Sequence, residues 1–137
     1  MYKIILLVIF LFLILLSLYH NETSVDDPIE SITLVITPTF GNGPLISDKT
    51  TIYSNGDVVA SHGKFNVGES NAAKLIKKFY DNGFFDWSDN LSTDSSDGSF
   101  IYFEVVTEKN YFKKGGLNPD FEKFVDCKKA FYECIGK

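Results

Sequence analysis

The side chains that could carry chemistry in this sequence are few and widely spaced. The two cysteines, Cys127 and Cys134, are seven positions apart on an expected helix, which places them on one face and about 10 Å from each other. A disulfide needs Cα atoms within about 7 Å. We therefore expect two unpaired thiols that pack as small buried hydrophobic side chains. A bridge to another molecule, or a bridge across a broken helix, is the alternative.

His62 is the only histidine in the part of the chain that we expect to fold. The active site of a hydrolase would need a nucleophile or a carboxylate beside this histidine. The sequence contains no G-x-S-x-G or H-E-x-x-H motif to support such a site. We therefore expect a surface histidine and no catalytic residue. A small hydrolase that uses His62 and a carboxylate is kept as the weakest alternative.

An acidic stretch, residues 89–97, is the main candidate for binding a cation. Residues 93–104 match several positions of an EF-hand loop, with Glu104 at position twelve. However, Thr93 stands at position one, where the ion needs a carboxylate, and Glu104 falls within an expected strand. We expect an ordinary acidic loop, and neither a metal site nor a cofactor.

The overall composition excludes further classes of protein. All thirteen basic residues are lysines, and eighteen Asp and Glu residues give a net charge of -5. An acidic chain without arginine is poorly suited to nucleic acids, because arginine supplies bidentate contacts to phosphate and guanine. A length of 137 residues with 45% hydrophobic side chains is sufficient for one globular domain with its own core.

The first residues of the chain indicate export. Residues 4–16 are uninterrupted apolar residues, and Lys3 is the only charge before them. A short positive segment before an apolar stretch directs secretion, although a full membrane span takes about 20 residues. Because no small-residue cleavage site follows, we predict an uncleaved signal-anchor, residues 1–19, with the domain outside the cytoplasm. Secretion after signal cleavage is the alternative.

Residues 20–29 are polar and acidic, and we interpret them as a linker. The single exported domain is then expected over residues 30–137. Asn21 and Asn90 fit the glycosylation sequon, which matters only in a glycosylating host.

The domain begins with patterns that are typical of strands. Apolar residues alternate over residues 32–37, which predicts a half-buried strand. Asn55-Gly56 separates two short β-prone runs, residues 50–54 and 57–61, and predicts a type I′ hairpin. Two further strands are expected at residues 99–107 and 111–114.

Helix signals follow both groups of strands. Ser70 is expected to cap a helix that runs to Tyr80 and is stopped by Gly83. Residues 84–87, Phe-Phe-Asp-Trp, are expected to pack under the sheet. Asn118 and Pro119 are expected to open a last helix. We predict an α+β fold, a two-layer sandwich whose antiparallel sheet of about five strands carries both helices on one face.

Residues 37–44, 51–59 and 84–86 together form a recognisable pattern, T-P-T-F-G-N-G-P, T-I-Y-S-N-G-D-V-V and F-F-D. It resembles a small exported bacterial domain of unknown function, which reads roughly T-P-C-F-G-x-C-P and then T-I-Y-x-D-G-x-V. Thr39 and Gly43 replace the two cysteines of that pattern, so the resemblance implies location and fold but no redox role. In size and element order the chain is also similar, more faintly, to small inhibitors of thermolysin-like metallopeptidases.

These observations favour an exported binding or accessory module, such as an inhibitor, whose partner is an exported or membrane protein. The glycine-rich segments at residues 41–43 and 115–116 lack phosphate-binding spacing, and we interpret them as turns. If both turns lie at one end of the sheet, they would form a recognition surface that contains Phe40, Asn42, Leu117 and Asn118. A structural envelope domain without a ligand is the main alternative.

Overall fold

The computed structural model of the chain describes residue 9 and residues 27–39, 46–95 and 97–137. The expected signal-anchor, apart from residue 9, and two members of the predicted recognition surface, Phe40 and Asn42, lie outside the described residues. Among the helices of the described part, none is long and apolar enough to cross a membrane.

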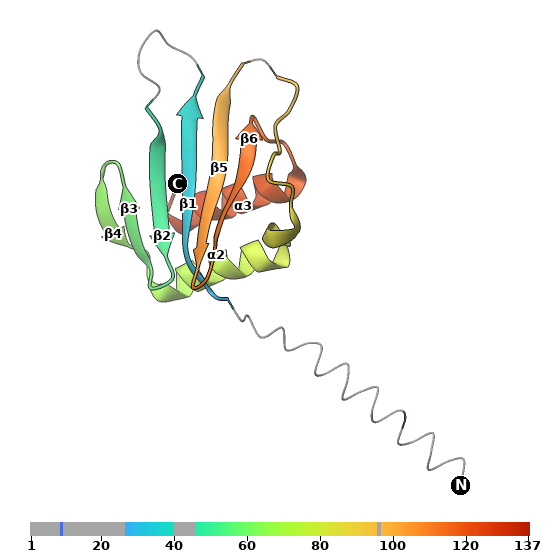
Figure 1. Ribbon diagram of the computed structural model, residues 1–137. Helices are drawn as coiled ribbons and strands as arrows, with labels where there is room; N and C mark the ends of the chain where they lie inside the picture. Colours follow the sequence, from blue (N-terminus) through green and yellow to red (C-terminus); the bar gives the residue numbers. More distant parts are fainter. Residues whose placement is uncertain (1–8, 10–26, 40–45, 96) are drawn as a thin grey trace.

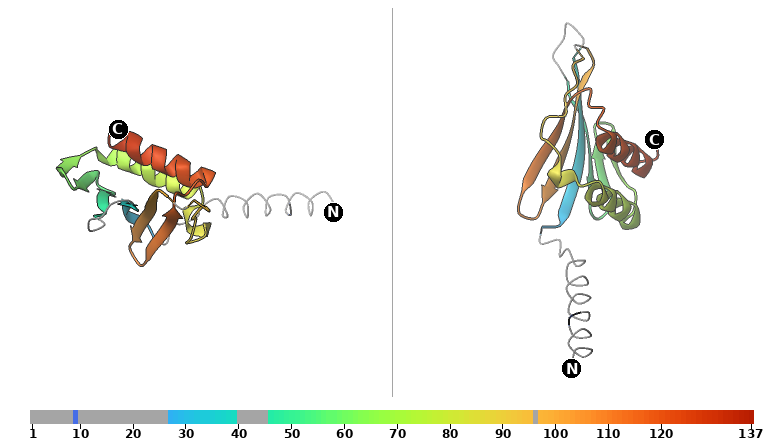
Figure 2. Two further views of the ribbon diagram at one scale, coloured as in Figure 1. Left: turned by 90° about the horizontal axis from the view of Figure 1, so that it is seen from above. Right: turned by 90° about the vertical axis from the view of Figure 1, so that its right-hand side faces the viewer.

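The domain is an α+β structure built on a six-stranded antiparallel sheet with the order β4-β3-β2-β1-β5-β6 (Figure 1). The strands are β1 (Ile29–Pro38), β2 (Asp48–Tyr53), β3 (Asp57–Ala60), β4 (Gly63–Asn66), β5 (Ser99–Thr107) and β6 (Tyr111–Leu117). The helices are α2 (Glu69–Asp81), the short 3-10 helix η1 (Phe84–Asp86) and α3 (Glu122–Cys134). Figure 2 shows α2 and α3 on the same side of the sheet, so no helix of the described residues lies over the opposite face.

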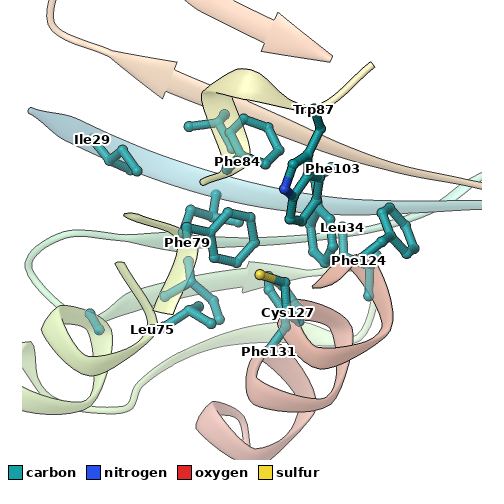
Figure 3. Close-up of a cluster of buried hydrophobic side chains, with 14 of the residues drawn as sticks. Ile29, Leu34, Leu75, Phe79, Phe84, Trp87, Phe103, Phe124, Cys127 and Phe131 are labelled. Carbon is teal, nitrogen blue, oxygen red and sulfur yellow. The ribbon is translucent and has the colours of Figure 1, made fainter. Parts of the chain in front are cut away.

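The core lies between the central strands and the two helices, and phenylalanine dominates it (Figure 3). Phe103 of β5 is fully buried, and its ring centroid lies 4.9 Å from that of Phe79 in α2 and 5.0 Å from that of Phe124 in α3. Edge-to-face and tilted contacts at these distances add to the gain from burying the rings. One strand residue therefore joins the sheet to both helices.

The aromatic segment after α2 packs under the sheet, as predicted. Phe84 is fully buried, Trp87 is 7% exposed, and their ring centroids are 5.2 Å apart. The indole Nε1 of Trp87 donates a hydrogen bond to the carbonyl oxygen of Asn82 at 2.8 Å. The left-handed glycine expected after the helix is also confirmed, since Gly83 has a φ of 65°.

Two hairpin details differ from the prediction. The type I′ turn is wrong, because only Gly56 of the expected pair has a positive φ, 89°. Gly56 N donates to Tyr53 O at 2.9 Å, and Asn55 Oδ1 accepts from Asp57 N, so the loop has three residues rather than two. The sixth strand, β4, was not predicted, because its sequence Gly-Lys-Phe-Asn shows no apolar alternation and all four residues are exposed.

The boundaries of the last elements also differ. Gly115 and Gly116 were interpreted as a turn, yet they continue β6 and pair with Tyr102 and Ile101 of β5. Asn118 does not cap α3, which begins four residues later with Phe121 at its N-cap. At the other helix, Gly68 rather than Ser70 is the N-cap of α2. Neither N-cap residue makes a side-chain capping hydrogen bond, so the expected capping side chains do not mark the helix starts.

Candidate functional site

The uncovered face of the sheet holds the best candidate for a recognition surface. Successive side chains of a strand point to opposite faces, so the neighbours of the buried Phe103 point away from the helices. Register aligns Phe100 with Leu117, and Glu104 with Lys113, across β5 and β6. We call these residues the open-face patch: Phe100, Tyr102, Glu104, Lys113 and Leu117.

One half of the patch is aromatic and aliphatic. The rings of Phe100 and Tyr102 lie nearly parallel, with an interplanar angle of 10° and centroids 6.4 Å apart. Phe100 is 38% exposed, while Tyr102 and Leu117 are half-buried. Gly115, which has no side chain, pairs with Tyr102 in the neighbouring strand. The result is a flat apolar area at the end of the sheet where β5 begins.

The other half of the patch is charged. Glu104 lies between two lysines, with carboxylate oxygens 3.9 Å from Lys49 Nζ and 3.8 Å from Lys113 Nζ. Lys113 Nζ also lies 4.5 Å from the ring centroid of Tyr102, within cation–π distance. Burial raises the pKa of the Tyr111 hydroxyl, and the nearby Glu104 carboxylate raises it further. The Glu104 side chain is only 18% exposed, whereas Lys49 and Lys113 are more exposed and border the patch.

Of the predicted surface, Leu117 lies on the patch, but the polar groups of Asn118 bind within the protein. Its backbone N donates to Ser99 O at 3.0 Å, and its Oδ1 accepts from Ser99 N at 2.9 Å. Its Nδ2 donates to Ser95 Oγ and to the carbonyl oxygen of Asp97. A φ of 44° accompanies these bonds. Asn118 therefore joins the end of β6 to the start of β5.

The end of β1 and residues 117–118 do lie at the same end of the sheet. Pro38 pairs with Ser99, the residue that Asn118 binds. Thr39 N donates to Gly98 O at 2.9 Å, beside the same strand end. The described part of this end therefore adjoins the apolar half of the patch.

Sequence reasoning missed Phe100 and Tyr102. The signal was present, because apolar residues occupy both faces of β5: Ile101, Phe103 and Val105 on one, and Phe100 and Tyr102 on the other. A strand with large apolar side chains on both faces is typical of a sheet covered twice. Here neither α2 nor α3 covers the second face, and Phe100 is 38% exposed there.

The other candidate residues take structural or exposed positions. His62 lies in the exposed turn between β3 and β4, and its ring stacks on Phe65 with centroids 6.4 Å apart. Glu104 lies within β5, as expected. Both cysteines are unpaired on the intact helix α3, as predicted, but only Cys127 is buried, whereas Cys134 is half-buried. Burial raises the pKa of Cys127 to about 11. In the described part of the chain, no group of three or more His, Cys, Asp or Glu residues could hold a metal.

Two surface grooves lie away from the patch. One, of about 340 Å³, runs between α2 and α3 and is bordered by Lys74, Lys78 and Cys134. A second, of about 550 Å³, lies against the β3–β4 hairpin and is bordered by Tyr53, Val59 and Phe65. Both are open at the surface, and neither is lined by His62.

No family model, no curated protein and no solved structure matches the chain. The fold and the patch therefore define the protein only as a small α+β domain whose two described long helices, α2 and α3, lie on one face of the sheet. The resemblance described from the sequence stays a prediction.

Proposed function

We propose that the protein is an exported, membrane-anchored binding or accessory module that recognises its partner through the open-face patch. The observation that carries the proposal is the accessible aromatic row of Phe100 and Tyr102 beside Leu117, on a face without a helix. Export and anchoring rest on the apolar residues 4–16 after Lys3. The proposal assigns no catalytic residue.

The composition of the patch is that of a protein interface. Tyrosine is enriched among residues that contribute most to binding, and such anchors are surrounded by polar groups at the rim. Here Lys113, which pairs with Glu104, lies over the ring of Tyr102. All three side chains project from β5 and β6, so little backbone order has to be gained on binding.

A structural envelope domain without a ligand is the second candidate function. The observation that favours it is the internal use of Asn118, whose side chain binds Ser95, Ser99 and Asp97 instead of facing a partner. The two candidate functions predict different results when the aromatic row is removed. A binding module would lose its partner, whereas a structural domain would lose no interaction.

A crosslinking experiment in intact cells tests the proposal, with a tag at the C-terminus. The C-terminus lies on the helix side of the sheet, away from the patch (Figure 2). The double variant Phe100→Ala/Leu117→Ala is compared with Val125→Ala, a matched exposed apolar residue on α3 that is 41% exposed. Circular dichroism checks that both variants remain folded.

We expect a partner that is captured by the wild type and by Val125→Ala but lost with the double variant. Equal capture by all three folded proteins would remove the patch as the recognition surface. If the wild type captures no partner from its own cells, the structural candidate is favoured. Fractionation of the same cells tests the anchor, since a released protein would be found in the medium.

A further inference from the structure

The chain enters the domain at a point that is fixed to the turn between β5 and β6. Asp27 accepts hydrogen bonds from Thr107 Oγ1 at 2.6 Å, from Lys109 N at 2.7 Å and from Asn110 Nδ2 at 2.7 Å. The carbonyl oxygen of the next residue, Pro28, accepts from a backbone N–H of the same turn at 3.1 Å. This turn and Asp27 together form the entry end of the domain.

The open-face patch extends toward the opposite end of the sheet. From Ile29, β1 runs for ten residues to Pro38, a length of about 30 Å at 3.3 Å per residue. At that far end Thr37 pairs with Phe100, and Phe100 pairs with Leu117. The apolar half of the patch is therefore separated from the entry end by nearly the whole length of the central strand.

The covalent tether limits how far the entry end can be from a membrane. The predicted signal-anchor ends at residue 19, eight residues before Asp27. At about 3.5 Å per residue, this length of chain spans at most about 28 Å. The entry end is thus held within that distance of the bilayer surface, whereas the far end is not attached.

The charges on the open face do not favour an alternative in which the domain lies flat on the bilayer. Lysines near an anionic surface are attracted to it. Lys49 and Lys113 both pair with Glu104, which reduces that attraction. Asp57 accompanies Lys64 across β3 and β4 on the same face. The face therefore lacks the run of unpaired lysines that anionic lipid headgroups would attract.

We infer that the domain presents its entry end to the membrane and directs Phe100 and Leu117 outward, toward an exported partner beyond the bilayer surface. This inference rests on the membrane anchor of the proposed function. It narrows the partner from any exported or membrane protein to an exported protein that reaches the far end of the domain.

Energy transfer to lipid tests the orientation with the full chain in vesicles. A single fluorophore is placed by Glu108→Cys at the entry end or by Asp94→Cys at the far end, both of which are exposed positions. Residue 94 follows Thr93, whose backbone N donates to Leu117 O. Both variants also carry Cys134→Ser, and Cys127 stays because it is fully buried. The acceptor is a headgroup-labelled lipid in both leaflets.

We expect greater transfer from the label at residue 108 than from the label at residue 94. Equal transfer from both, with the protein in the vesicle fraction, would overturn the orientation while leaving the anchor intact. Protein that does not associate with the vesicles, with no transfer from either label, would also overturn the inference, because the membrane anchor on which it rests would be absent. Partner capture in cells is measured separately, so its loss would test the proposed function without affecting the energy-transfer results.

Discussion

Lys114 is a buried lysine whose ammonium group donates a hydrogen bond to the carbonyl oxygen of Phe85 at 2.9 Å. Lys114 is only 4% exposed, and the same ammonium also donates to Trp87 O and lies 3.7 Å from the Asp89 carboxylate. These carbonyls belong to η1 and to the residue after it, where no backbone donor satisfies them within the helix. A single side chain of β6 therefore attaches the aromatic segment to the sheet.

Lys114→Met is expected to lower the free energy of unfolding by about 2–3 kcal/mol, because carbonyl groups in a buried position lose their donor. Urea unfolding followed by tryptophan fluorescence measures the change, since Trp87 lies in the affected segment. Lys113→Met is the matched control on the same strand, with a side chain that is 46% exposed. Equal losses in both variants would show that the buried hydrogen bonds of Lys114 are of no special importance.

Gly116 lets the chain segment at Asn90 run alongside the edge strand β6. Leu91 N donates to Gly115 O at 2.7 Å and Thr93 N to Leu117 O at 3.0 Å, so the edge is paired rather than open. A Cβ at Gly116 would lie 2.6 Å from the backbone N of Ser92, a distance that requires the backbone to move.

Gly116→Ala is therefore expected to destabilise the protein by about 1–3 kcal/mol, as overpacking of a close contact does. Hydrogen exchange should also speed up at the amides of Leu91 and Thr93. Gly63→Ala is the control, because Gly63 also has a positive φ but a Cβ there meets nothing within 4 Å. Unchanged exchange in Gly116→Ala would contradict the proposed role of the glycine.

Local sequence patterns predicted the position of a strand and the end of a helix. The alternation around Ile32 and Leu34 corresponds to the central strand β1, and Gly83 ends the helix because only a glycine takes a left-handed φ at low cost. Gly116 and Asn118 were misinterpreted because their roles depend on Ser92 and Ser99, which lie far away in the sequence. A sequence pattern carries no information about such partners.

The same limit applies to the candidate site. Leu117 was predicted to belong to a recognition surface because it follows a glycine pair, and it does lie on the open face beside Phe100. The aromatic row itself was not predicted, because an apolar residue on a strand is equally consistent with a covered and an uncovered face. Only the placement of α2 and α3 on one side decides between the two.

The entry end supplies a prediction about pH. Partial desolvation tends to raise the pKa of Asp27, but hydrogen bonds from Thr107, Asn110 and Lys109 outweigh it, so the pKa is lowered. A carboxyl group whose pKa is lowered in the folded state stabilises the fold. The contribution is complete at pH values above the pKa of the same group in the unfolded chain, about 3.9. That contribution is lost as the pH falls through the lowered, folded value.

Asp27→Asn should therefore be less stable than the wild type at neutral pH, and the difference should shrink as the pH is lowered below about 4. Thermal unfolding of both proteins between neutral and acidic pH measures the difference. Glu108→Gln, at an exposed position in the same turn, should follow the wild type throughout. A gap between Asp27→Asn and the wild type that stays constant down to the most acidic pH would mean that the carboxylate charge does not stabilise the entry end. Asp27 would then be held to the turn between β5 and β6 by neutral hydrogen bonds alone.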